Sequence, residues 1–361
     1  PRGNVVASSR KALSLKPFGR SEWALAFSAS LPGLYSVEAE FSGDMRLPRR
    51  SEVYVLPPLP PAPKELRLRK LLEVDLTQPL GPERFCDDGT SRVVRSEAGV
   101  YREAGPRRFS RFAVRFAIEH PGLPHLFVVH FPDDKERCAE VSTYSPHRLD
   151  RFNAHTGYLT GGEFPLSMRM RKLPLLVFPR EREQGLVFTS WEAGKPVAVS
   201  KVEVYEIEGG LPESVPEGAQ ERLIGLYFED PMLSYCFGSL KSSPDLEDFD
   251  RAARNLASYM RYAGLNVLFY PLVWYRGPLY DSEVEDVAKS VASNRHPPEG
   301  FVETLLERLN KVGAKFFGSI WIHSLPSVVE GAVRDEEAVR RGADTPLTCL
   351  LYTSPSPRDR G

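Results

Sequence analysis

The sequence predicts a multidomain protein of the β plus α/β class, in which antiparallel β-sandwich modules precede a truncated (β/α) barrel of about three βα units. Three observations predict this fold. Short strands of period two occur in the first 209 residues, a run of prolines interrupts them, and a helix–glycine–strand unit occurs twice near the end. A helix, a tight turn and a buried strand in succession are typical of a parallel α/β sheet.

Composition excludes several classes of protein. The chain has 361 residues, enough for two or three domains, and a formal net charge of -1, so it offers no general surface for nucleic acid. No apolar run approaches the ~20 residues of a membrane-spanning helix. The four cysteines show no CxxC spacing and no cofactor motif occurs. The sequence therefore predicts no metal site, no disulfide framework and no cofactor.

The N-terminal segment, residues 1–56, reads as the C-terminal part of a β-sandwich. From Tyr35 to Phe41, apolar and polar residues alternate with the period of a half-buried strand, and no helical period occurs in the segment. The proline-rich run at residues 57–64 cannot join a sheet ladder and stays extended. We therefore expect a linker and a domain boundary there.

Residues 65–209 predict a β-sandwich of their own. Alternating residues run from Phe112 to Ile118, and a turn sequence at 132–135 separates two further strands. Regular short strands with turn signals between them indicate an antiparallel sandwich. A polar stretch at residues 210–220 is expected to be a second linker. We interpret His125 and His130 as structural.

Two acidic pairs in this module have two interpretations. The sequences Asp87-Asp88-Gly89 and Asp133-Asp134 could supply oxygen ligands to calcium. Turn chemistry explains the same residues more simply, and we favour it.

Residues 221–348 predict the N-terminal part of a (β/α)8 barrel. The strands are expected at 223–228, 265–270 and 315–321. The first long helix is expected to start with Ser243 as its cap, and a further helix at 326–341. A doubly wound sheet should show a glycine-rich phosphate loop after its first strand, and none is present. The long aromatic loop after the second strand also favours a barrel.

The two ends of the sequence predict a fragment. The chain begins at Pro1 in what reads as mid-domain sequence, and residues 349–359 match a translated sequencing adapter, so we set residues 349–361 aside from fold reasoning. We expect the natural protein to continue through the rest of a barrel.

Three segments carry a resemblance to a known group of proteins. They are residues 156–166, 202–207 and 262–271. The chain resembles uncharacterised bacterial glycoside-hydrolase-like proteins, in which β-sandwich modules precede a (β/α)8 barrel. The resemblance implies a polysaccharide or oligosaccharide substrate and an extracellular or periplasmic location.

Candidate substrate-binding residues follow the predicted parallel strands, where sites of such sheets lie. The candidates are Glu229 and Asp230 after the first strand, Trp274, Tyr275 and Asp281 after the second, and Trp321 and His323 after the third. Aromatic faces stack on sugar rings, and carboxylates bind sugar hydroxyls. The structural alternatives are turns or caps for the carboxylates and histidine, and loop packing for the rings.

No catalytic residue is assigned. Glycosidases usually need two carboxylates ~5–10 Å apart, and in the barrels that this chain resembles they come from strands four and seven. We therefore expect a glycoside-hydrolase fragment without activity. The alternative is a non-catalytic carbohydrate-binding or cell-surface protein that uses the barrel as a scaffold, because no GxSxG, HExxH or kinase motif is present.

Overall fold

The computed structural model describes Ser8 and residues 31–39, 49–144, 154–214, 222–241, 244–274, 277–280, 282–283 and 297–321. The chain divides into two compact units, Pro1–Pro58 and Leu59–Gly361. In the first unit, β1 (Gly33–Ala39) pairs antiparallel with β2 (Arg49–Val55). The predicted helix at 326–341 and the adapter-like segment lie outside the described residues.

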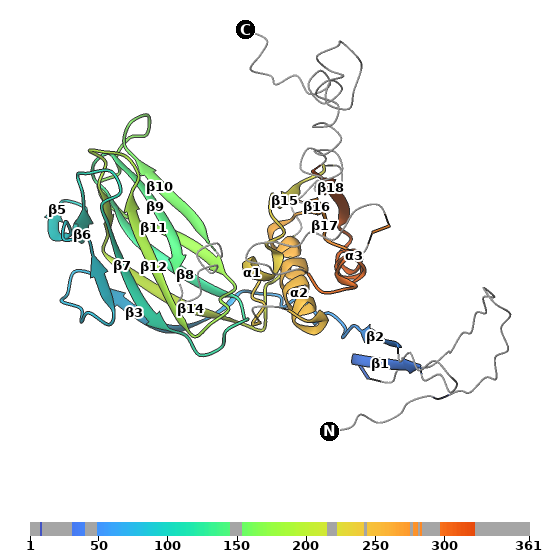
Figure 1. Cartoon of the computed structure of the whole chain (residues 1–361). Coiled ribbons are helices and arrows are strands. Elements are labelled where there is room, and N and C mark those ends of the chain that lie inside the picture. The colour runs from blue at the N-terminus through green and yellow to red at the C-terminus, as the bar shows by residue number, and fades with distance from the viewer. Residues whose placement is uncertain are drawn as a thin grey trace, which may run out of the picture. The chain divides into compact units, whose positions relative to one another are not determined.

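The second unit begins with an antiparallel β-sandwich, as predicted (Figure 1). One sheet has the order β10 (His155–Thr160), β9 (Arg137–Tyr144), β12 (Glu183–Ser190), β7 (Arg111–Ala117) and β4 (Phe85–Asp87). The other has the order β11 (Arg169–Val177), β8 (His125–Asp133), β14 (Lys201–Glu208) and β3 (Arg67–Asp75). A third, small sheet contains β13 (Val197–Val199), β6 (Gly99–Ala104) and β5 (Arg92–Ser96).

The core of the sandwich follows from the period of two along its strands. In β7, Phe112 and Val114 are buried whereas Arg111 is exposed, because successive side chains point to opposite faces of a sheet. The two inner faces meet through aromatic rings. Phe131 stacks on Tyr158 with ring centroids 4.0 Å apart.

Both histidines of β8 are buried and paired within the sandwich. The Nδ1 atom of His125 lies 2.9 Å from the Leu123 carbonyl oxygen, and the Nε2 atom of His130 lies 2.8 Å from a carboxylate oxygen of Glu203. Both histidines are therefore part of the packed sandwich, and the His125 Nε2 atom has no hydrogen-bond partner among the described residues.

A parallel sheet follows the sandwich. Its strands are β15 (Gly225–Tyr227), β16 (Val267–Trp274) and β18 (Lys315–Ile320), with β16 in the centre. The short helix α1 (Leu233–Cys236) and α2 (Leu246–Ala263) connect β15 to β16, and α3 (Phe301–Lys311) precedes β18. A two-residue strand, β17 (Gly277–Pro278), pairs antiparallel with the end of β16. The three predicted strands are present, and within the described residues the sheet is open.

The start of α2 corrects the sequence prediction. The cap is Asp245, whose carboxylate accepts a hydrogen bond from the Asp248 backbone N–H at 2.9 Å, and the helix begins at Leu246 rather than at Pro244. The prediction of a Ser243 cap was therefore wrong. Aspartate caps a helix as well as serine does, because its side chain also accepts a hydrogen bond from a backbone N–H of the first turn that has no partner within the helix. Gly264 ends the helix with a φ of 69°.

A buried ion pair joins α2 to α3. Arg308 donates through Nε and Nη2 to the two carboxylate oxygens of Asp250, at 2.5 and 2.8 Å. Both side chains are almost fully buried. The bidentate geometry aligns the two helices on one face of the parallel sheet.

The sandwich and the parallel sheet share a hydrophobic core. Phe178, Ile207 and Leu211 pack in the same cluster as residues of α2, α3 and β16. Arg180 donates to the carbonyl oxygens of Ser239 and Lys241 across this junction, at 2.5 and 2.7 Å. Leu211, which is buried, lies in the segment predicted as a linker. The domain boundaries stay predictions.

The stability of the protein is expected to depend on pH through Glu203, which lies on β14 in the four-stranded sheet of the sandwich. Burial opposes ionisation of Glu203, but hydrogen bonds from His130, Lys201 and Lys70 outweigh burial and lower its pKa to about 2. The unfolded carboxylate titrates near pH ~4.3. The contribution of Glu203 to stability is therefore present above that pH and is lost as pH falls toward 2.

We predict that Glu203→Gln is less stable than the natural sequence at pH 7 and that the difference shrinks as pH falls from about 4.5 to 3. Urea unfolding followed by circular dichroism at several pH values measures it. The matched control is Glu119→Gln, whose exposed carboxylate contacts only Arg69 among the described residues and should matter little. A stability difference that is independent of pH would contradict the prediction.

Candidate functional site

The predicted site at the carboxyl ends of the parallel strands is partly described. Trp274 is the last residue of β16 and Trp321 follows β18, and both are half-buried. Val273 aligns with Ile320, and the Trp321 backbone N–H donates to the Val273 carbonyl oxygen at 3.0 Å. The structure therefore brings the two tryptophans to the same level of the sheet edge.

The two carboxylates of this predicted site lie at a different level. Glu229 and Asp230 are exposed and follow β15, which ends opposite Phe269, well before the end of β16 at Trp274. β17 pairs with Val273 and Trp274, which lie further along β16 than Phe269. Tyr275, Asp281 and His323 lie outside the described residues.

Asp87 and Asp88 form turns, as favoured above, whereas Asp133 is the last residue of β8 and bonds to a segment 34 residues away. Asp87 accepts from the Gly89 backbone N–H at 3.1 Å, and Asp88 accepts from that of Thr90 at 3.0 Å. Asp133 accepts from the Ser167 backbone N–H at 3.1 Å. In the part of the chain that the structure describes, no group of three or more His, Cys, Asp or Glu side chains is arranged to hold a metal ion.

Four loops gather at one end of the sandwich, which we call the loop end. Arg111 at the start of β7 aligns with Thr189 near the end of β12, and Arg137 at the start of β9 aligns with Thr160 at the end of β10. These alignments bring together residues 105–110, 134–136, 161–168 and 191–196. Loops on a rigid sandwich are common places for binding sites.

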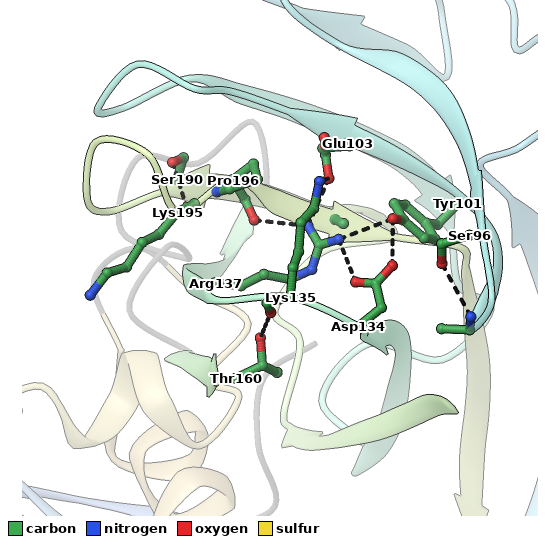
Figure 2. A network of polar contacts seen from close by, with 12 residues as sticks. Ser96, Tyr101, Glu103, Asp134, Lys135, Arg137, Thr160, Ser190, Lys195 and Pro196 are labelled. Atoms are coloured by element: carbon green, nitrogen blue, oxygen red, sulfur yellow. Dashed lines mark hydrogen bonds and ion pairs between the residues drawn. The ribbon is translucent and has the colours of Figure 1, made fainter. Parts of the chain in front are cut away.

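A buried arginine lies beneath the loop end. Figure 2 shows the Arg137 guanidinium between Glu103 and Asp134. It donates to Glu103 at 2.9 Å, to Asp134 at 2.8 Å, to the Pro196 carbonyl oxygen at 3.1 Å and to the Tyr101 hydroxyl at 3.2 Å. Burial opposes its charge, but the bonds to the two carboxylates outweigh burial and raise its pKa. One side chain thereby joins β6, the β8–β9 turn and the loop after β12.

The loop after β12 is held by further hydrogen bonds. The Trp191 backbone N–H donates to the Cys138 carbonyl oxygen at 2.9 Å, and the Ser190 hydroxyl donates to the carbonyl oxygen of Lys195 at 2.9 Å. Gly194 has a φ of 80°, which favours glycine, and donates to the Pro106 carbonyl oxygen at 2.8 Å. Trp191 thus projects from a loop that is fixed on several sides.

Two exposed aromatic rings meet at the loop end. Phe109 is 48% exposed and Trp191 is 44% exposed, and their centroids lie 5.5 Å apart at an interplanar angle of 75°. We call these two residues the aromatic pair. The guanidinium carbon of Arg108 lies 4.5 Å from the Phe109 centroid and 5.8 Å from that of Trp191. Its Nε donates to the Trp191 carbonyl oxygen at 3.2 Å.

The backbone of Phe109 is strained. Its φ is 66°, in the left-handed region that aromatic residues rarely adopt, at a cost of about 1–3 kcal/mol. The Phe109 backbone N–H donates to the Ser190 carbonyl oxygen at 2.7 Å, and the next residue donates to Arg107 at 3.2 Å. Phe109 is 48% exposed, so burial of its ring does not offset this strain.

Sequence reasoning missed the aromatic pair. Arg108 and Trp191 are 83 residues apart in the chain, and only the pairing of β7 with β12 brings them together. The sequence offered one local indication of a surface position for each ring: Phe109 and Trp191 lie just outside strand ends, beside charged residues. That signal does not predict that the two rings touch.

A shallow cavity of about 420 Å³ lies elsewhere on the second unit. Its lining comes from residues 63–67 and the end of β14, including Lys64, Glu65 and Glu208, and contains no aromatic ring. We do not assign a site to it, because it gathers neither stacking surfaces nor buried polar groups.

Comparison with known proteins identifies no family. No protein-family model and no curated protein matches the chain. Similar solved structures include a family 35 carbohydrate-binding module from Clostridium thermocellum, with 12% identity, 37% of this chain and 98% of that chain covered, and a TM-score of 0.27. A module of the same family from Cellvibrio japonicus has 11% identity, covers 37% and 92%, and has a TM-score of 0.27.

An exo-β-1,3-galactanase from Phanerochaete chrysosporium is also similar, with 12% identity and a TM-score of 0.26. The match covers 37% of this chain and 29% of the galactanase, so the chain corresponds to less than a third of that enzyme. All three TM-scores are below 0.5.

We predict that Arg137→Met lowers the free energy of unfolding by about 3–5 kcal/mol, because it removes the ion pair of the buried Asp134 and leaves Glu103 with Lys135 as its remaining ion-pair partner among the described residues. Amide hydrogen exchange should accelerate in residues 134–136 and 191–196. The control is Lys135→Met, which also removes a partner of Glu103 but from a half-exposed position and should cost below about 1 kcal/mol. Equal losses in the two variants would contradict the assignment.

Proposed function

We propose that this chain binds carbohydrate and that the aromatic pair at the loop end is its binding surface. The observation that supports the proposal best is the strained, exposed Phe109 held against Trp191 by backbone hydrogen bonds. The apolar C–H face of a sugar ring stacks on an aromatic face, and Trp offers the largest such face. A surface that is rigid before binding loses little entropy when the ligand arrives.

The two rings have different roles in this proposal. Trp191 supplies the stacking face, since it lies on the loop that Arg137 and Gly194 fix. Phe109 supports the edge of the surface and carries the Arg108 guanidinium on its own ring. The partner is a polysaccharide or oligosaccharide, and we place the protein outside the cytoplasm. No helix among the described residues is long and apolar enough to cross a membrane.

We predict that Trp191→Ala weakens binding to a polysaccharide ligand at least tenfold, which corresponds to about 1.4 kcal/mol. Phe109→Ala should weaken it less, because it removes the support rather than the stacking face. Affinity electrophoresis of the full chain in gels with a panel of plant and fungal polysaccharides measures the effect. Tyr144→Ala is the control, since Tyr144 is 39% exposed in the same sandwich but outside the loop end. Unchanged retardation of Trp191→Ala would refute the proposal.

A second candidate function is that of a glycoside-hydrolase fragment, and the parallel sheet favours it. Leu268 and Tyr270 pack against the helices, whereas Tyr227, Phe269 and Phe317 align across the other, exposed face. In a (β/α)8 barrel this second face would be the packed interior. In that case the predicted residues at the strand ends would form one wall of the substrate cleft: Glu229, Asp230, Trp274, Tyr275, Asp281, Trp321 and His323.

The hydrolase candidate makes its own prediction. In a parent enzyme the catalytic carboxylates would lie on later strands, so the 361-residue chain should bind polysaccharide without releasing reducing sugar. A reducing-sugar assay with the same polysaccharides measures this. The control variant is Glu229→Gln. Turnover by the chain that Glu229→Gln abolishes would show that the catalytic groups are already present and would overturn the fragment proposal.

A further inference from the structure

We propose that acid loosens the loop that ties the sandwich to α2, and that His125 is the residue whose protonation does so. The loop comprises residues 118–124, between β7 and β8, and we call it the β7–β8 loop. It lies at the end of the sandwich opposite the loop end, so the inference does not rest on the proposed carbohydrate binding. It follows from a buried imidazole nitrogen without a partner, from the charges that face this nitrogen and from the hydrogen bonds of the loop.

His125 is completely buried, and one of its ring nitrogens has no partner. Nδ1 lies 2.9 Å from the Leu123 carbonyl oxygen, which can only accept, so Nδ1 carries the proton of the neutral ring. Nε2 is then unprotonated, and it has no hydrogen-bond partner among the described residues. Acid would add a proton and a charge at this atom. A buried, charged N–H without an acceptor is costly, so burial lowers the pKa of His125.

The charged groups that face His125 are already bound to one another. A carboxylate oxygen of Glu206 lies 3.9 Å from Nε2, which is too far for a hydrogen bond. The Glu206 oxygens lie 2.7 Å from Nδ1 of His120 and 3.1 Å from Nη2 of Arg69. Arg69 also pairs with Glu119 at 3.0 Å. The charge of Glu206 favours a proton on the buried ring, whereas His120 and Arg69 oppose it.

Protonation of His125 therefore destabilises the closed β7–β8 loop in one of two ways. In the first, the new N–H stays buried without an acceptor. In the second, Glu206 moves by about 1 Å to reach the usual bond length of ~2.9 Å and leaves His120, which belongs to the loop. The His120 side chain is 56% exposed, so water can take the place of the carboxylate. In both cases an open loop, in which water solvates the charged ring, gains stability relative to the closed one.

The β7–β8 loop is bonded to three other segments of the second unit. The Gly122 backbone N–H donates to the Pro179 carbonyl oxygen at 2.6 Å, after the end of β11. The Gly122 carbonyl oxygen accepts from the side chain of Asn255, on α2, at 3.0 Å. The Pro124 carbonyl oxygen accepts from the Ile207 backbone N–H, on β14, at 3.0 Å. Opening of the loop therefore removes a direct hydrogen bond between the sandwich and α2.

The direction and the size of the effect follow from proton linkage. A histidine in a hydrated, open loop titrates near pH ~6.5, whereas the closed loop keeps His125 neutral to a lower pH. The open form binds more protons below pH ~6.5, so the closed form is favoured above that pH and loses stability as pH falls. A single proton can shift this equilibrium by at most about tenfold for each pH unit below ~6.5.

The test is amide hydrogen exchange of the full chain at pH 7.5 and 5.5, corrected for the intrinsic effect of pH on exchange. We expect the protection of residues 118–124 to fall about tenfold, the limit for one proton, and that of β9 to stay constant. His125→Gln should remove this fall, because glutamine does not titrate. His120→Gln should keep it. The matched control is His155→Gln, which should also keep it, since His155 is an exposed histidine of the same sandwich that pairs with Glu140 at 3.0 Å.

A second measurement covers the case in which His125→Gln does not fold. Nuclear magnetic resonance of the natural sequence with labelled histidine reports the charge of each ring. We expect a neutral His125 ring with its proton on Nδ1 at pH 7.5, and a charged ring only as the loop loses protection. The inference is wrong if protection of the loop does not change between the two pH values, or if a folded His125→Gln variant keeps the change. It is also wrong if the His125 ring becomes charged while the loop stays protected.

Discussion

The loop end depends on one buried positive charge. Arg137 lies out of reach of water, where an unbalanced charge is costly. Its two Nη groups are hydrogen-bonded, whereas its Nε has no hydrogen-bond partner among the described residues. Glu103 and Asp134 balance the charge, and the Tyr101 hydroxyl and the Pro196 carbonyl oxygen accept further hydrogen bonds. These partners come from three parts of the chain: β6, the β8–β9 turn and the loop after β12. The bonds of one side chain therefore tie these three segments together.

That constraint explains how an exposed ring can be rigid. Pro196 belongs to the same loop as Trp191, and the carbonyl oxygen of Ser190 holds the strained backbone of Phe109. The hydrogen bond from the Phe109 backbone N–H to Ser190, the last residue of β12, ties this unfavourable conformation to the sandwich. In the same way Arg108 is ordered by the ring it covers. The surface is thus ordered before any ligand binds, which suits a binding site better than a flexible loop would.

The sandwich and the parallel sheet are joined at the other end of the sandwich strands. Phe178 follows the end of β11, whereas the loop end surrounds the start of that strand. Arg180 donates to two carbonyl oxygens across the junction. The sandwich and the parallel sheet therefore share one hydrophobic core and are not separate domains joined by a linker. The aromatic pair and the tryptophans of the parallel sheet therefore belong to separate surfaces, which can have separate ligands.

Local patterns in the sequence predicted a large part of the fold. The period of two along β7, the apolar face of α2 and the glycine at its end are local patterns, and local sterics and burial decide them. Local sequence patterns do not predict contacts between segments that are distant in the chain. The sequence therefore predicted Trp274 and Trp321 as parts of one site, from the repeat of a βα unit, but not that Phe109 meets Trp191. That contact depends on tertiary packing, because the register of β7 on β12 and the partners of Arg137 are set when the whole sandwich packs.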